Sequence, residues 1–295
     1  MEKRRSVREY KEKALSSQDL KQVMSYCDTY PKLSQKTDVS FKLLEDGDDV
    51  ASKLDGVAGY SGVMIKAPHY LLVMASASEN AYKAAGYAGE FIILNVTKHD
   101  IGTCWIDGVD QSDKIKELLE IESDQMVIGL IALGHAKYEP RLAHIYDTNM
   151  DGSVSPLTDL GYPNIDSEYS KEPVSNRLSI DEISYLKKWG AAVDASELHK
   201  RGYDQVFYYM RMAPSWGNRQ PWRFILDGTK IVLVMERDDR VDDRAEEVEA
   251  GIAMIYFEVA MHDNGLPGHW NSDDIADAGK YEIPENHFIG GYYTF

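Results

Sequence analysis

The amino-acid sequence predicts an α+β fold of two similar halves, each with a β-sheet flanked by helices. The main observation is a repeat: AGYAGEFIILNVTKHDIGTCW (85–105) and AGIAMIYFEVAMHDNGLPGHW (250–270) align without a gap. Each runs from small residues through an apolar helical stripe to a Gly-containing turn before a Trp. Each also follows a strand-like run, HYLLVMA or KIVLVME. Two halves built alike commonly pack about a pseudo-twofold axis.

The remaining elements repeat in the same order. Helices are predicted from an N-capping Ser16 to Cys27, and from an N-capping Asp194 to Met210, ahead of Pro214. Strands are predicted in the first half at VSFKLL (39–44), HYLLVMA (69–75) and DQMVIGLIAL (124–133), and in the second at WRFILD (222–227), KIVLVME (230–236) and ENHFIGGYYTF (285–295). The order is helix, strand, strand, helix, strand, twice. We therefore expect a first half over 1–146, a polar linker over 147–175 and a second half over 176–295.

Composition narrows the classes of function. The 295 residues suffice for two domains or one large fused unit. A formal net charge of −17 disfavours nucleic acid and anionic lipid as partners. Two cysteines cannot form a disulfide framework and fit a reducing, cytoplasmic setting. The sequence has no apolar signal core at its start, and no apolar run approaches the roughly 18 residues that span a bilayer.

A basic cluster stands out against this acidic background, formed by Lys3, Arg4, Arg5 and Arg8. Such a local positive site can select a small anion such as a phosphate ester. It can equally be a solvated, partly frayed N-terminus. The composition alone leaves both interpretations open.

Two segments together, RRSVREY and APSWGNRQPWRF, closely resemble the signatures of the FMN-dependent nitroreductase family, Arg-Arg-Ser-x-Arg and Ala-Pro-Ser-x-x-Asn-x-Gln-Pro-Trp. The resemblance covers about 4–141 and 194–295 and points to a single-chain, two-repeat branch. It implies the nitroreductase-like fold, with FMN as cofactor, NADH or NADPH as electron donor, and a small electron-poor molecule as acceptor. Family members are usually homodimers with each flavin between the subunits.

Here the two signatures lie in different halves. The first half shows only DTYPKLSQKT where the Asn-x-Gln element should follow its helix, and the second opens with EPVSNRLS in place of the Arg cluster. The resemblance therefore predicts one complete site and one dismantled site. We expect one FMN per chain, a monomer that imitates the family dimer, and no flavin at the symmetry-related position.

Each part of FMN has candidate ligands. Arg4, Arg5, Arg8 and Arg141 can donate charge-assisted hydrogen bonds to the phosphate, and Ser6 can add a hydroxyl contact. By resemblance, Lys137 also lies near the phosphate, and one of the first two arginines reaches the pyrimidine edge of the ring. The resemblance places these further residues around the ribityl chain and the ring: Trp105, Ile106, Asp107 and Gly108 beside N5, and Pro214, Ser215, Asn218 and Gln220 from the second half.

Some of these residues can equally have a purely structural role. Asn218 and Gln220 can form turn hydrogen bonds, and Asp107 can be an exposed turn residue. Trp216 can border the pocket, whereas Trp222 is expected in the core.

No protein side chain is predicted to act as acid, base or nucleophile, because the flavin carries the hydride chemistry. The alternatives are a flavin-binding protein without turnover and a flavoenzyme of the same fold with a non-nitro substrate. The sequence also lacks a G-x-G-x-x-G fingerprint. The segment Asp147–Ser155 matches the start of an EF-hand loop, but Thr158 replaces the bidentate Glu, so an Asx-rich turn is the other interpretation and no metal is assigned.

Overall fold

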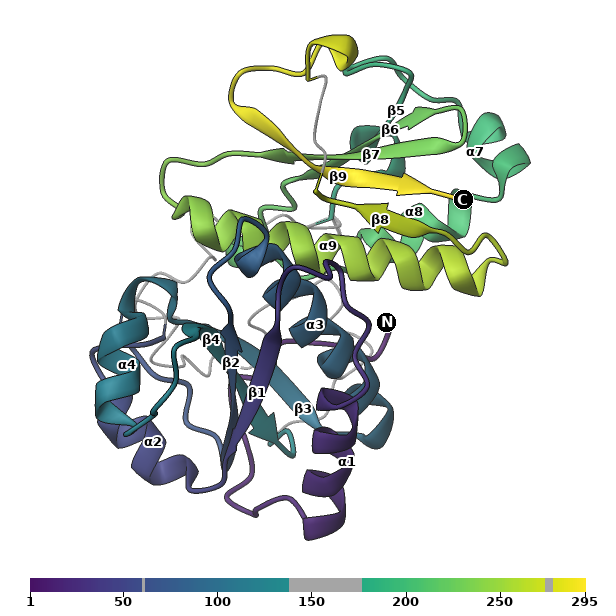
Figure 1. Ribbon diagram of the computed structural model, residues 1–295. Helices are drawn as coiled ribbons and strands as arrows, with labels where there is room; N and C mark the ends of the chain where they lie inside the picture. Colours follow the sequence, from purple (N-terminus) through teal and green to yellow (C-terminus); the bar gives the residue numbers. More distant parts are fainter. Residues whose placement is uncertain (60–61, 138–176, 274–277) are drawn as a thin grey trace, which may run out of the picture.

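The structure is a computed structural model that describes residues 1–59, 62–137, 177–273 and 278–295. It contains two β-sheets, one in each half of the chain (Figure 1). The elements of the first half are α1 (Ser17–Cys27), β1 (Val39–Leu44), α2 (Gly47–Leu54), β2 (His69–Ala75), α3 (Ala81–Val96), η1 (Thr97–His99), β3 (Gly102–Asp107), η2 (Val109–Gln111), α4 (Ser112–Leu118) and β4 (Met126–Gly134). Those of the second half are α6 (Ile180–Ile183), β5 (Ser184–Leu186), α7 (Ala195–Arg201), α8 (Asp204–Met210), η4 (Trp216–Asn218), β6 (Trp222–Asp227), β7 (Lys230–Glu236), α9 (Asp243–Asp263), β8 (His269–Asn271), η5 (Ala278–Tyr281) and β9 (His287–Thr294).

The first sheet is antiparallel, with the strand order β1-β2-β4-β3, and helices cover both of its faces. Successive side chains of a strand point to opposite faces. In β2, Leu71 and Val73 pack in one cluster with α1 and α3, whereas Tyr70 and Leu72 pack in another with α2 and α4. Every residue of β2 is therefore buried.

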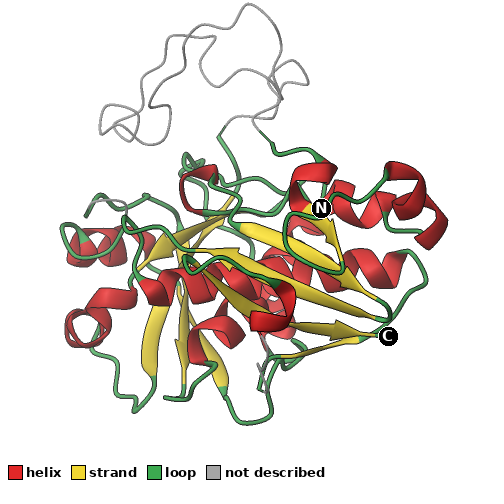
Figure 2. Cartoon of the chain, turned by 90° about the horizontal axis from the view of Figure 1, so that it is seen from above, coloured by secondary structure: helices red, strands yellow, loops and turns green. Residues whose placement is uncertain are grey.

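The second sheet repeats this order as β6-β7-β9-β8 and adds β5, which pairs in parallel at the edge next to β6. The two sheets also share an irregularity in strand register. The pairing with β2 skips Ile128 in β4, and the pairing with β7 skips Gly290 at the matching place in β9. Figure 2 shows the strands and the helices around them from a second direction. The predicted fold class, two similar halves that each contain a sheet flanked by helices, is confirmed.

The halves meet along their two long helices, α3 and α9 (Figure 1). A Cβ atom on Gly86 of α3 would lie 2.1 Å from the carbonyl oxygen of Val248, and one on Gly251 of α9 would lie 1.9 Å from that of Lys83. Gly86 and Gly251 are equivalent in the repeat. Gly86 lies against Val248, three residues before Gly251, and Gly251 lies against Lys83, three residues before Gly86. The contacts are thus reciprocal, as a pseudo-twofold axis requires.

Four strands lie where the sequence predicts them, with the same bounds: β1, β2, β6 and β7. A turn precedes each of the two tryptophans, as predicted, over 97–100 in the first half and 264–265 in the second. The sequence did not predict the edge strands that follow these turns, β3 and β8, which contain Trp105 and Trp270 and pair with β4 and β9. The single helix predicted from 194 to 210 is also divided, because Gly202 takes a left-handed conformation (φ 73°) and ends α7.

Other predictions lie outside the described residues: Arg141, the whole 147–175 linker and, within it, the EF-hand-like segment Asp147–Ser155. The boundaries of the halves near 146 and 176 stay a prediction for the same reason. Within the parts of the chain that the structure describes, no helix is both long and apolar enough to cross a membrane.

Candidate active site between the two halves

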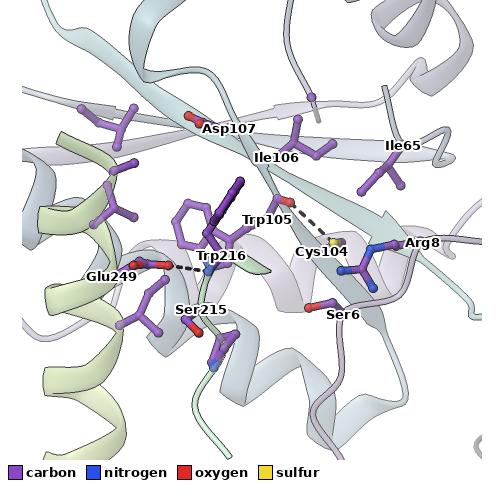
Figure 3. Close-up of a pocket in the computed structure, with 16 residues that line it drawn as sticks. Ser6, Arg8, Ile65, Cys104, Trp105, Ile106, Asp107, Ser215, Trp216 and Glu249 are labelled. Carbon is purple, nitrogen blue, oxygen red and sulfur yellow. Dashed lines mark hydrogen bonds between the residues drawn. The ribbon is translucent and has the colours of Figure 1, made fainter. Parts of the chain in front are cut away.

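A cavity of about 260 Å³ lies between the two halves, beside β3 and the first turns of α9 (Figure 3). Both signature segments contribute to it. The lining residues are Ser6, Arg8, Gly59, Ile65, Cys104, Trp105, Ile106, Asp107 and Ile128 from the first half, and Pro214, Ser215, Trp216, Ala245, Val248, Glu249 and Ile252 from the second. The structure thus brings the N-terminal segment and the segment after α8 to one place, as the resemblance implies.

The N-terminal segment is held beside the first sheet by backbone pairing. Ser6 forms a parallel bridge with Thr103 at the start of β3, and the Val7 N–H donates to the Thr103 carbonyl oxygen at 2.8 Å. Extended backbone alternates its side chains, so Val7 is buried against the protein while Ser6 and Arg8 line the cavity. Tyr10 then pairs with Ala136 beyond β4. The alternation in RRSVREY is therefore what directs a hydroxyl and a guanidinium group into the cavity.

Arg4 and Arg5 are placed differently from Arg8. The Arg4 side chain is buried, with its Nε 3.9 Å from Glu90 Oε1 on α3. Its Nη1 lies 3.5 Å from the Ser6 hydroxyl, to which it donates a long hydrogen bond. Arg5 is half-buried and does not line the cavity. The structure therefore places only Arg8 of these three arginines on the cavity wall, and Arg4 behind it.

Trp105 forms a wall of the cavity and is fixed from the opposite side. Its indole Nε1 donates to Glu90 Oε2 at 2.8 Å, and its ring packs on Gly89, where a Cβ would come within 2.4 Å of the ring. Glu90 is fully buried, and burial raises its pKa to about 7 against the opposing effect of Arg4. The wall that carries Trp105 therefore depends on a buried carboxyl group that the sequence motifs do not indicate.

The predicted segment beside N5 continues from Trp105 to the end of β3. Ile106 and Asp107 line the cavity, and the Gly59 N–H donates to the Asp107 carbonyl oxygen at 3.1 Å. The Asp107 side chain is exposed. Gly108 follows directly but does not line the cavity; a Cβ there would lie 2.8 Å from the Ile115 side chain.

The second half contributes a compact loop between α8 and β6. Pro214, Ser215 and Trp216 line the cavity, whereas Asn218 and Gln220 do not. The Gln220 side chain accepts from the Leu178 N–H at 3.0 Å and donates to the Asn218 carbonyl oxygen at 3.2 Å. Gln220 is buried and takes a left-handed conformation, as does Asn218. In the structure these two residues shape the loop, which matches the alternative that the sequence left open.

Glu249 of α9 anchors this loop. Its Oε1 accepts the Trp216 N–H, and its Oε2 accepts Arg219 Nη2 at 2.7 Å. Burial raises the pKa of Glu249 to about 7, and Arg219 opposes that rise. Sequence reasoning missed Glu249 and Glu90. The available signal was an acidic residue within the small and apolar runs EVEAGIAM and AGYAGEFIIL, where no charge is expected on a packed face.

The other predicted residues have clear positions where they are described. Lys137 lies beside the N-terminal segment, where its N–H donates to the Glu9 carbonyl oxygen at 3.0 Å and its Nζ is 3.8 Å from the Glu9 carboxylate. It does not line the cavity. Trp222 is fully buried in the core of the second half, as expected.

The position related to the cavity by the pseudo-twofold axis lies near Trp270, the counterpart of Trp105. There, Asn80 Nδ2 donates to Asp273 Oδ1 at 2.7 Å, and Lys36 Nζ lies 3.5 Å from Asp273 Oδ2. Side chains of the two halves therefore bond to each other at this position. The expectation that it holds no flavin stays a prediction.

The buried Glu90 makes a pH-dependent contribution to stability. Because its pKa is raised in the folded state, folding is favoured below the ordinary pKa of Glu, and this contribution is lost as the pH rises through about 7. A pKa shift of this size corresponds to roughly 3 kcal/mol in the free energy of unfolding. Glu90→Gln removes the titrating group but keeps an acceptor for the Trp105 indole. Between about pH 5 and about pH 8, the free energy of unfolding measured with urea should therefore fall less for the variant than for the wild type. Parallel wild-type and variant curves would contradict this assignment.

The repeated strand order and the cavity between the halves define a nitroreductase-like α+β protein. The chain belongs to the family described as "Putative TM nitroreductase", whose profile matches residues 1–261. Both the resemblance and the class, a nitroreductase-family oxidoreductase, are thereby confirmed.

Several solved structures are similar to this chain, and one of them agrees with it in overall fold. A protein described as a putative nitroreductase from Thermotoga maritima is 16% identical, with a TM-score of 0.55 over 99% of this chain and 90% of that one. A nitroreductase with bound FMN from Bacteroides fragilis is 18% identical (TM-score 0.41) over 52% of this chain and 94% of that one. An FMN-dependent nitroreductase from Clostridium difficile is 21% identical (TM-score 0.41) over 57% and 96%. No curated protein sequence matches this chain.

Proposed function

We propose that this protein is an FMN-dependent NAD(P)H oxidoreductase that reduces a small electron-poor acceptor. The observation that carries this proposal is the cavity shared by the two halves, with Ser6 and Arg8 from one signature and Pro214 and Ser215 from the other. The proposed cofactor site consists of these residues together with Trp105, Ile106 and Asp107. Arg4, Arg5, Gly108, Lys137, Asn218 and Gln220 do not line the cavity and remain candidates, as does Arg141, which lies outside the described residues.

The chemistry of the cavity lining fits FMN. The Arg8 guanidinium and the Ser6 hydroxyl are hydrogen-bond donors suited to a phosphate dianion. Away from them, the walls are mainly apolar and aromatic, with Ile65, Ile106 and Trp105 on one side and Val248 and Ile252 on the other. Such walls suit a flat ring and exclude water from it. Bound FMN would supply hydride transfer from a nicotinamide to the acceptor.

The protein's part in this reaction is binding and orientation. Arg8 and Ser6 hold the anionic end, Trp105 is fixed by Glu90, and the Trp216 segment is fixed by Glu249. With one cavity of this size at the site, the nicotinamide and the acceptor would occupy the same place in turn, which corresponds to a ping-pong cycle. Both walls come from one chain, so a monomer suffices to complete the site.

Reconstitution tests the proposal directly. The purified chain, incubated with FMN and desalted, should retain about one flavin per chain, in keeping with a single cross-half site. Anaerobic mixing with NADH or NADPH should then bleach the bound flavin, and a nitroaromatic acceptor should restore its colour. Failure to bind FMN would reject the proposal, and two flavins per chain would reject the single site. Binding without bleaching would instead assign a flavin-binding protein without turnover.

A further inference from the structure

The charges that line the cavity are unequally distributed. Among the described lining residues, the charged side chains are one cation, Arg8, and two carboxylates, Asp107 and Glu249 (Figure 3). In the proposed function the phosphate of FMN occupies Arg8. The charged side chains left to face the ring and the acceptor are then both acidic.

Glu249 is held firmly at this place. It is only 5% exposed, and its two oxygens accept hydrogen bonds from the Trp216 N–H and from Arg219. Arg219 is also 3.6 Å from Asp238, so its charge is shared between two carboxylates. Glu249 lines the cavity, whereas Arg219 does not. An acceptor in the cavity would therefore contact Glu249 and not its cationic partner.

We propose that Glu249, assisted by Asp107, makes the site selective for neutral or cationic planar acceptors and against anionic ones. The proposal rests on the proposed function and deepens it by naming a substrate class. Like charges within an apolar, water-excluding cavity repel each other more strongly than in bulk water. The apolar and indole walls meanwhile provide contact area for a flat, neutral molecule. Glu249 is thus a specificity-determining residue that the acceptor approaches directly.

The selectivity should depend on pH, because burial raises the pKa of Glu249 to about 7. Two charged groups facing it act in opposite directions: Arg219 favours the carboxylate, and Glu246 one turn earlier on α9 disfavours it. Asp107 and Arg8 are the other charged side chains among the described lining residues. As the pH rises from about 6 to about 8, Glu249 becomes charged and discrimination against anions should increase.

A matched pair of acceptors tests this proposal: 4-nitrobenzenesulfonate, a permanent anion, and 4-nitrobenzenesulfonamide, a neutral molecule of the same shape. For the FMN-loaded enzyme at about pH 8, Glu249→Gln should raise kcat/KM for the anion relative to the neutral compound by about tenfold. Equilibrium binding to the oxidised enzyme, followed by the flavin absorbance, should change in the same ratio. At about pH 6 the variant and wild type should differ less.

Two further variants make the result decisive. Glu246→Gln removes a buried carboxylate from the same helix that does not line the cavity. At about pH 8, where Glu249 is already charged, this variant should leave the acceptor ratio unchanged. Asp107→Asn changes an exposed lining residue and should shift the ratio in the same direction as Glu249→Gln, even if the latter folds poorly. An unchanged ratio in both lining variants, with FMN bound and reduced normally, would overturn the selectivity alone. A chain that binds no FMN would overturn the proposed function and this proposal with it.

Discussion

Gly251→Ala should destabilise the protein by about 3 kcal/mol or more, because the added methyl group has no space. Its carbon would lie 1.9 Å from the Lys83 carbonyl oxygen and 2.7 Å from the Tyr87 backbone nitrogen. Both atoms belong to the backbone of α3, so the clash cannot be relieved by rotating a side chain. The helices would have to separate, and the lost packing would extend along the α3–α9 contact.

Thermal and urea unfolding measure this effect, and the midpoint temperature should fall by roughly 6–12 °C. Gly86→Ala should behave alike, since its Cβ would lie 2.1 Å from the Val248 carbonyl oxygen. Gly279→Ala is the matched control, because nothing lies within 4 Å of a Cβ at that position. If Gly251→Ala unfolds at the same temperature as the control, the close helix contact described here does not exist.

The second large effect is expected at Arg8, whose replacement by alanine should weaken FMN binding by roughly 10- to 100-fold. A hydrogen bond to a charged group contributes about 1.5–3 kcal/mol, which corresponds to such a factor. Arg8 lies on the cavity wall beside Ser6, whereas Arg4 is paired with Glu90 behind that wall. The loss should therefore be specific to the phosphate group of the ligand.

Riboflavin, which has the same ring without the phosphate, provides the internal control. Arg8→Ala should leave riboflavin affinity nearly unchanged, so that the preference for FMN over riboflavin disappears. Lys3→Ala removes an exposed charge from the same basic cluster and should alter neither affinity. Equal losses for FMN and riboflavin would show that Arg8 supports the fold of the site and does not bind the phosphate.

The sequence predicted the bounds of four strands well and the short elements poorly. The runs at β1, β2, β6 and β7 are apolar and bounded by turn residues, so their bounds could be read directly. The edge strand β3 was not predicted, because Gly102 opens it and its pairing with β4 is non-local. The helices α2 and α4 have 8 and 7 residues and too few turns for a periodic pattern to emerge.

Residues of the candidate site could be predicted where they belong to a linear motif and were missed where their position depends on packing. RRSVREY predicted Ser6 and Arg8, whose alternation with Val7 the structure explains. The same motif could not distinguish Arg8 from Arg4, because the distinction depends on Glu90, a buried carboxyl group in a distant element, α3. Glu249 was missed for the same reason: its partners Trp216 and Arg219 come from a distant loop.

The reciprocal contact of Gly86 and Gly251 joins two copies of one element that are encoded separately. In a homodimer, any substitution appears on both sides of the symmetry axis at once, so a change that closes one site closes both. In a single chain each copy can change alone. The cavity beside Trp105 can therefore keep Arg8 and Glu249 while the place beside Trp270 gains the bond between Asn80 and Asp273. Covalent linkage turns a symmetric pair of pockets into two independently variable positions, so that one of them can change without affecting the other.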